Sequence, residues 1–441
     1  MNAHLPVVDL VIEARWVVPV EPAGAVLDQH AVVVDAGRIV AVVPQAEVDG
    51  RFVARKRKHL PQHVLLPGLV NLHTHAAMTL LRGLADDLPL MQWLQDHVWP
   101  AEARHASAQF VHDGTLLACA EMLRGGITCF NDMYFFPAAA AEAALASGIR
   151  AAIGLITVDF PSNYAADADD YLAKGLAARD RFLGQTLLSF CLAPHAPYTV
   201  ADRSFVQVLT LAEQIELPLH LHLHETVQEI EDSRQRFAMR PLERLRRLGL
   251  LGPGLIAVHA VHLEAQEIEL LAAHGCSVAH CPSSNLKLAS GIAPIAQLAA
   301  RGVNLGLGTD GAASNNRLDL FQEMRLAALL GKQRDGRADA IDAHQVLRMA
   351  TLGGACALGL DADIGSIAVG KWADLCAVSF DDVALVPCYD PVSHLAYAAG
   401  REHVSDVWVA GRIRVDDGRL VENDESGLIR LALLWQNKIR P

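Results

Sequence analysis

The pattern of apolar and polar positions divides the chain into three parts. From 6 to 66, short runs rich in Val and Ile are separated by Gly, Pro and Asp, which predicts the strands of a small β-sandwich or open barrel. From about 67 to 365, apolar runs of four to seven residues alternate with longer amphipathic stretches, the pattern of parallel strands joined by crossover helices. After about 366 the pattern is β-like again.

We therefore expect a discontinuous second domain, a β-sandwich built from 1–66 and 366–441, around a central domain at 67–365. The segments DAGRIVAVV (35–43) and VAGRIRVDDGRLV (409–421) are locally similar, which predicts that they form adjacent strands of one small sheet.

Eight apolar runs of the central part stop at a polar residue. They lie at 66–72, 127–131, 150–158, 187–194, 218–222, 255–259, 276–280 and 303–309. Eight strands over about 300 residues match the size of a TIM-like (β/α)8 barrel, in which active sites lie at the C-terminal ends of the strands. A doubly wound sheet is the competing arrangement, and it would gather its site at one crevice.

Composition narrows the class of protein. The 441 residues are 52% hydrophobic, enough for a sizeable core. The formal net charge of -13 disfavours a nucleic-acid partner, and the basic run at 51–58 is expected to be a solvated loop. No segment reaches the roughly 20 uncharged apolar residues of a membrane helix. The eight cysteines show no C-x-x-C spacing and mostly lie in apolar runs, so we expect a reduced, cytoplasmic setting.

The residues that end these runs include several metal-binding types. His73 and His75 follow an apolar run one residue apart, and a strand that ends there points both imidazoles the same way. Taken alone, such a pair could be ordinary polar residues at a strand end. Later runs end near further candidates: His195, His220, His222, His224, Glu225, His259, His262 and Asp310. Imidazole nitrogens and a carboxylate are donors that zinc prefers, with one position left open for water.

The ordered set His73-x-His75, His222-x-x-Glu225, His259 and Asp310 resembles the amidohydrolase superfamily. The segments PGLVNLHTHAAMTLLRG, SSNLKLASGIAP and GLGTDGAASNN are similar to the branch that deaminates 5'-methylthioadenosine and S-adenosylhomocysteine. The resemblance covers nearly the whole chain and implies an amidohydrolase-type barrel with a two-ended sandwich. It also implies a hydrolase that acts on the C–N bond of a cyclic amidine.

By this resemblance one divalent metal, expected to be zinc, is held by the side chains of His73, His75, His222 and Asp310. Spacing alone does not select His222, because His220, His222 and His224 share a strand face. The family pattern selects it and implies that His220 lies in the barrel interior and His224 at the rim. Binuclear relatives bridge two metals with a carboxylated lysine, and the stretch 175–286 contains no lysine, which favours one metal.

The resemblance also implies the chemistry. Zinc lowers the pKa of its water, Asp310 and His259 take the proton, and Glu225 protonates N1 of an adenine ring before ammonia leaves C6. Each residue also has a simpler interpretation. Glu225 could be a surface acid that opens a helix, His259 a structural hydrogen-bond partner, and Asp310 part of a turn.

Four further residues are implied to bind the substrate: Trp93, Glu102, His195 and Ser314. Glu102 would accept hydrogen bonds from the ribose hydroxyls, whereas Trp93 could equally be a core residue of an amphipathic helix. Family members that accept S-adenosylhomocysteine use arginines after the third strand, and here 158–175 contains none. Methylthioadenosine is therefore favoured, with S-adenosylhomocysteine or adenosine as alternatives.

Two rival functions remain open. A related aminohydrolase could act on guanine-like or triazine substrates, although Glu225 and Glu102 favour amine loss from a nucleoside. The chain could also be a non-catalytic scaffold that kept the fold, since a barrel does not imply activity. We expect a small-molecule substrate and neither a nucleic-acid nor a membrane partner; the sequence leaves open a homo-oligomer.

Overall fold

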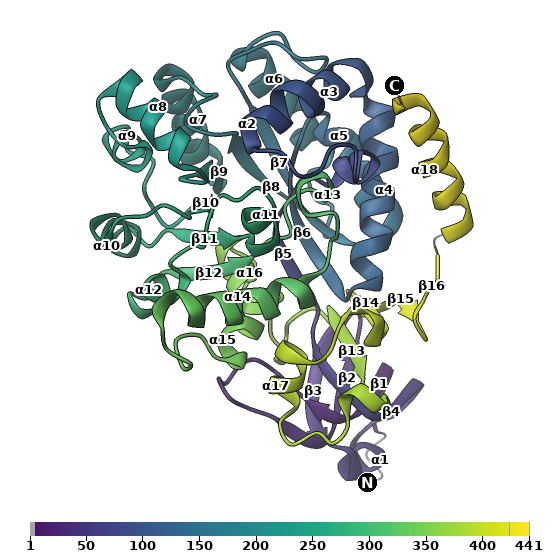
Figure 1. The fold of residues 1–441 in the computed structure, drawn as a ribbon. Coiled ribbons are helices and arrows are strands. Elements are labelled where there is room, and N and C mark those ends of the chain that lie inside the picture. Colours follow the sequence, from purple (N-terminus) through teal and green to yellow (C-terminus); the bar gives the residue numbers. More distant parts are fainter. Residues whose placement is uncertain (1–4, 423, 441) are drawn as a thin grey trace.

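The computed structural model describes residues 5–422 and 424–440. It consists of a barrel surrounded by helices and a separate β-sheet below it (Figure 1). The two chain ends supply the strands of the separate sheet, and the middle of the chain supplies the barrel.

The barrel is a parallel sheet whose strands pair in sequence order. Its strands are β5 (Leu69–Thr74), β6 (Ile127–Tyr134), β7 (Arg150–Thr157), β8 (Leu188–Pro194), β9 (Leu219–Leu223), β10 (Leu255–His259), β11 (Ser277–His280) and β12 (Asn304–Leu307). The two outermost strands meet, because the backbone N–H of Asp310 after β12 donates to the carbonyl of His73 in β5 at 3.0 Å. Each strand overlaps one predicted apolar run, and consecutive pairing confirms the (β/α)8 barrel over a doubly wound sheet.

Helices cover the outside of the barrel (Figure 1). They are α4 (Ala108–Arg124), α5 (Pro137–Ser147), α6 (Ala168–Arg181), α7 (Asp202–Ile215), α8 (Val227–Phe237), α9 (Pro241–Arg247), α10 (Ala265–Ala273), α11 (Pro282–Lys287), α12 (Ile295–Ala300), α14 (Leu320–Asp335), α15 (Ala343–Arg348) and α16 (Gly354–Ala357). Polar side chains begin several of them: the Ser107 hydroxyl accepts from the N–H of Phe110, and Thr226 accepts from that of Glu229. Short helices α2 (Leu90–Trp93), α3 (Trp99–His105) and α13 (Ala312–Asn315) lie in the loops after the barrel strands.

The second sheet has the strand order β16-β15-β14-β13-β4-β1-β2-β3. Its strands are β1 (Val7–Val17), β2 (Leu27–Asp35), β3 (Arg38–Pro44), β4 (Val53–Pro67), β13 (Leu375–Ser379), β14 (Val404–Val409), β15 (Arg412–Asp416) and β16 (Arg419–Leu420). The antiparallel pair β4–β13 joins the N-terminal half of the sheet to the C-terminal half. The predicted β-sandwich from both chain ends is one eight-stranded sheet, and the prediction that both ends supply it is confirmed.

The prediction that 35–43 and 409–421 form adjacent strands is wrong. Each segment pairs within its own hairpin, β2–β3 or β14–β15, and the two hairpins lie toward opposite ends of the strand order. Their turns nevertheless come together around Ala373, whose N–H donates to Gly37 and whose carbonyl accepts from Gly411. Gly37 has φ +78°, and a Cβ there would lie 2.6 Å from the carbonyl oxygen of Ala410, so this approach requires glycine.

A buried ion pair links the sheet to the lower end of the barrel. Nε of Arg150, the first residue of β7, lies 2.8 Å from Oδ2 of Asp374, and both side chains are almost fully buried. Asp374 also accepts a hydrogen bond from the backbone N–H of Ala410 at 2.7 Å. Because a buried charge needs its partner, this pair ties the two parts together.

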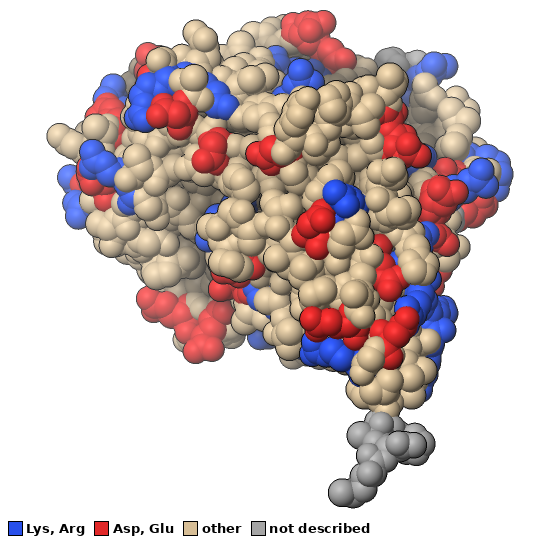
Figure 2. Space-filling model, turned by 90° about the horizontal axis from the view of Figure 1, so that it is seen from below, with Lys and Arg blue, Asp and Glu red and all other residues tan. Residues whose placement is uncertain are grey.

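The C-terminal part of the chain also supplies two helices that pack on the barrel helices. Helix α17 (Pro391–Tyr397) contacts α14 and α15, and α18 (Glu425–Ile439) lies along α4 (Figure 1). On α18, Nε1 of Trp435 donates to Asp113 of α4 at 2.8 Å. Seen from below, acidic and basic side chains are interspersed over the surface (Figure 2). Among the described residues, none of the helices combines the length and apolar character needed to cross a membrane.

Candidate active site

His73 in the first barrel strand and His75 just after that strand meet an aspartate that follows the last strand. Nε2 of His73 lies 3.4 Å, and Nε2 of His75 3.3 Å, from Oδ1 of Asp310. The barrel closes between β5 and β12, so these groups are far apart in sequence but adjacent in space. All three side chains are buried or nearly so.

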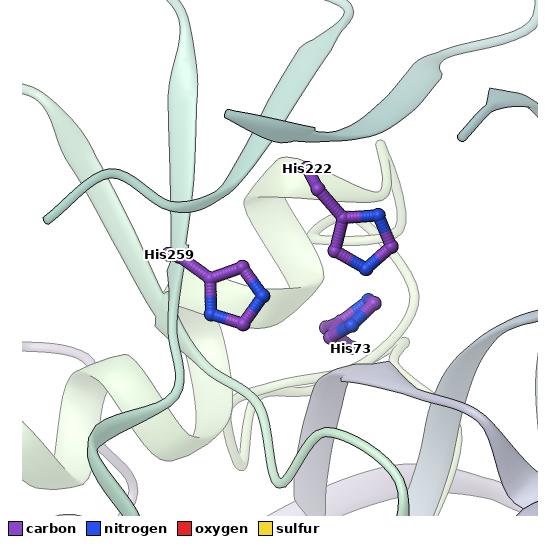
Figure 3. Close-up of side chains that lie close together, drawn as sticks. All are labelled: His73, His222 and His259. Atoms are coloured by element: carbon purple, nitrogen blue, oxygen red, sulfur yellow. The ribbon is translucent and has the colours of Figure 1, made fainter. Parts of the chain in front are cut away.

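Two further histidines approach the same point from β9 and β10. Potential ligand atoms of His73, His222 and His259 all lie within 4.8 Å of one another, as do those of His73, His75 and Asp310. Figure 3 shows the imidazole of His73 below those of His222 and His259, with ring nitrogens turned toward one another. His73 belongs to both groups, so together they offer four imidazoles and one carboxylate around a single centre.

The second ring nitrogen of each histidine has a partner. Nδ1 of His75 bonds to the carbonyl of Met133 at 2.6 Å and that of His222 to the carbonyl of His195 at 2.7 Å. Nδ1 of His259 bonds to Oδ1 of Asn285 at 2.8 Å, and that of His73 to Nε2 of His220 at 2.9 Å. Bonds to oxygen fix Nδ1 as the donor, which leaves Nε2 free as a ligand atom.

The donor set fits a metal ion. Nε2 of His73 is buried and has no hydrogen-bond partner, which is costly unless another ligand satisfies it. Burial lowers the pKa of His73 to about 4, so the ring is neutral near pH 7, the form that binds a metal. Imidazoles with one carboxylate are typical ligands of zinc. The predicted ligands His73, His75, His222 and Asp310 are thus brought together, and His259 could complete the set.

The carboxylate of Asp310 is held by its neighbours. Oδ2 accepts from the hydroxyls of Ser284 at 2.6 Å and Ser314 at 2.8 Å, and Oδ1 accepts from the N–H of Gly311 at 2.7 Å. Burial alone would raise the pKa of Asp310, but the interaction with His73 and the nearby histidines hold it well below its usual range. Ser314, predicted to contact substrate, thus donates to Asp310, although it also lines the cavity.

Glu225 lies just beyond β9 and is only 4% exposed, so it is not a surface acid. Its Oε2 is 3.7 Å from Nε2 of His259. Burial raises the pKa of Glu225, against the effect of His259. A carboxyl group with a raised pKa beside a histidine is suited to carry a proton.

A cavity of about 500 Å³ lies over the site, and the residues at its floor include His75, His222, Glu225, His259 and Asp310. Its walls are largely apolar, with Trp93, Trp99, Phe135, Phe160 and Tyr164 among the residues that line it. Trp93 is mostly buried at 6% exposure and still faces this space, so it is both a core and a cavity residue. A cavity of this volume is of the size that small-molecule sites have.

Glu102 and His195, both predicted to bind substrate, also line the cavity. Oε1 of Glu102 accepts from the hydroxyl of Tyr134 at 2.6 Å, and burial raises the pKa of Glu102 to about 7. Nδ1 of His195 lies 2.9 Å from Oγ1 of Thr199, and burial lowers its pKa to about 3. His195 therefore faces the cavity as a neutral ring.

Several residues that support the site were not predicted from the sequence. Ser284 donates to Asp310, and Asn285 is the partner of His259. Both residues lie within the segment SSNLKLASGIAP, but the sequence predicted no function for either. Tyr134 is the last residue of β6, so the rule that polar residues end barrel strands could have identified it. His224, predicted at the rim, is fully buried, because its ring accepts from the backbone N–H of Leu242 at 3.1 Å.

Known proteins are similar to this chain over most of its length. A family model described as "Amidohydrolase family" matches residues 64–414. A protein of Saccharophagus degradans named 5-methylthioadenosine/S-adenosylhomocysteine deaminase is 46% identical, over 98% of this chain and 97% of its own length. A 5'-deoxyadenosine deaminase of Methanothermobacter thermautotrophicus is 43% identical, over 84% of this chain and 86% of its own. The crystal structure of an adenosine deaminase from Xanthomonas campestris, determined with bound zinc, is 50% identical with a TM-score of 0.98, covering 99% and 100% of the two chains.

Proposed function

Because the chain belongs to the amidohydrolase family, we propose that it is a zinc-dependent hydrolase that removes the 6-amino group of an adenine nucleoside. Water is consumed, and the products are the inosine analogue and ammonia. One observation carries the proposal: a buried carboxyl group, Glu225, stands beside a metal-binding cluster at the floor of a cavity large enough for a nucleoside.

His73, His75, His222 and Asp310 hold the metal in this proposal, and zinc supplies a water of lowered pKa when it is bound. Asp310 and His259 are the groups that would take up the proton lost by the attacking water. Nε2 of His259 suits this role, because the bond of Nδ1 to Asn285 leaves Nε2 unprotonated. The oxygen of that water would add to C6 of the adenine ring.

Glu225 donates its proton to N1 as C6 becomes tetrahedral. Its raised pKa supports this role, since a fully ionised carboxylate would have no proton to give. Over the whole reaction one water proton leaves on ammonia. The other water proton replaces the one that Glu225 has given to N1. We propose that His259 passes this proton to Glu225, since the two side chains are 3.7 Å apart.

The cavity wall supports a nucleoside with an apolar 5' substituent. Glu102 accepts hydrogen bonds from the vicinal ribose hydroxyls, and the bond from Tyr134 orients its carboxylate. Among the described residues, those lining the cavity include neither lysine nor arginine. A homocysteine carboxylate would lack the cation that such a group requires, whereas a methylthio group would pack on aromatic rings. Methylthioadenosine is therefore the favoured substrate.

The experiment that tests this function is ammonia release by the purified, zinc-loaded protein. Methylthioadenosine, S-adenosylhomocysteine, 5'-deoxyadenosine, adenosine, guanine and an amino-substituted triazine are compared at equal concentration. We expect the highest kcat/KM with methylthioadenosine and clear activity with other adenine nucleosides. Activity confined to guanine or the triazine would contradict the assignment of a nucleoside substrate, and no release from any compound would contradict the proposed reaction.

A further inference from the structure

A second buried carboxylate, Glu229, lies directly behind Glu225. It belongs to the first turn of α8 and is 6% exposed. Its Oε1 accepts from the backbone N–H of His224 at 3.0 Å, and its Oε2 accepts from that of Glu225 at 2.8 Å. Glu229 thus holds the backbone at the proton-donating residue, while its own carboxylate is not placed to touch the reacting atoms.

The backbone at this point is unusual and firmly held. His224 has φ +53°, a left-handed conformation that is uncommon for a residue with a side chain. The carbonyl of His224 accepts from the N–H groups of Val261 and His262, both at 3.1 Å. The segment is therefore fixed on one side by the residues after His259 and on the other by Glu229. Such backbone strain persists only where surrounding contacts enforce it.

We propose that Glu229 is a positioning residue for the deaminase reaction: its two hydrogen bonds keep Glu225 within proton-transfer reach of His259. This inference rests on the proposed function. Two parallel hydrogen bonds to one carboxyl group fix its orientation as well as its distance. A misplacement of about 1 Å at a reacting group can reduce a rate on the order of 100-fold, so small backbone shifts at Glu225 matter.

The test begins with Glu229→Gln. The glutamine amide has nearly the same shape as the carboxyl group but offers only one oxygen to the N–H groups of His224 and Glu225. One of the two hydrogen bonds is therefore lost, and the side-chain NH2 group faces a backbone N–H. We expect kcat on methylthioadenosine to fall by about 10- to 100-fold with KM changed by less than about threefold. Zinc content should be unchanged, because none of the proposed ligands is altered.

Two controls separate positioning from general damage. Glu231→Gln makes the same change at an exposed site on α8, and its kcat should equal that of the parent protein. Asp374→Asn removes a buried carboxylate at the opposite end of the barrel, so it should lower thermal stability while kcat is retained at a temperature where the variant is folded. A Glu229→Gln protein that loses stability but keeps its kcat would overturn the proposal.

The decisive measurement is a double-mutant cycle with Glu225→Gln. If Glu229 acts through Glu225, adding Glu229→Gln to that variant should reduce the residual turnover by less than about twofold. A full, additive loss would refute positioning through Glu225. Normal turnover by Glu225→Gln would refute the role of Glu225 itself. A strong loss in that variant alone, with normal turnover by Glu229→Gln, would refute only the present inference.

Discussion

Glu225→Gln should remove most turnover without removing the metal. The side chain is 4% exposed and its burial raises its pKa, so it is placed to be protonated when substrate binds. Glutamine has a similar shape but cannot release a proton. Loss of a general acid or base costs on the order of 10²- to 10⁴-fold, which corresponds to about 3 to 5 kcal/mol of barrier. We expect a fall in kcat of that size with methylthioadenosine.

The assay measures ammonia release under single-turnover and steady-state conditions, together with bound zinc by mass spectrometry. Glu225 is not among the proposed ligands, so zinc content should match that of the parent. Glu231→Gln serves as the control for the chemical change itself. A near-normal kcat would refute the role of Glu225 in proton transfer. Loss of zinc in parallel with activity would instead make Glu225 part of the metal site.

Three further predictions concern the metal, the pH dependence and stability. Substitution of His73 by Ala should lower the amount of bound zinc, and full occupancy in this variant would contradict the proposed ligand set. Burial raises the pKa of Glu102 to about 7, so its ionised form, which accepts the ribose hydroxyls, is lost as pH falls below 7. KM for nucleosides should therefore rise between pH 8 and pH 6, and Glu102→Gln should abolish that change; a KM that does not vary with pH in the parent would argue against ribose binding by Glu102. Asp374→Asn leaves the buried Arg150 without its charged partner and should lower the free energy of unfolding by about 3 to 5 kcal/mol, as measured by urea denaturation. An unchanged midpoint would show that the pair contributes little.

The barrel was predictable because its strands are buried on both faces. Most of the strands are nearly continuous apolar runs that end where the strand meets the site, whereas β9 (LHLHL) alternates Leu with His. The apolar run and the polar residue that ends it together define the element. The arrangement of the second sheet was not predictable from similarity between its segments. Two hairpins with the same Ala-Gly-Arg turn can lie toward opposite ends of one sheet, because each strand of a hairpin pairs with the strand next to it in the sequence.

The residues of the site were also only partly predictable from the sequence. His73 and His75 were identifiable from spacing, whereas His222 had to be separated from His220 and His224 by family pattern. The physical difference lies in the conformation of the chain after β9: His224 adopts a left-handed conformation that turns its ring toward Leu242 and away from the site. A sequence records no such turn directly. Supporting residues such as Asn285 were missed because hydrogen bonds to a ring nitrogen leave no spacing pattern.

The pairing of β4 with β13 has a consequence for synthesis and folding. Strand β4 ends at Pro67, but its partner begins at Leu375, so about 300 residues of barrel must leave the ribosome before this edge can be covered. Until then the apolar end of β4, which includes Val64 and Leu65, presents an unpaired edge that invites intermolecular pairing. This edge therefore stays open to intermolecular pairing until β13 emerges, even after the strands of the catalytic barrel have been synthesised.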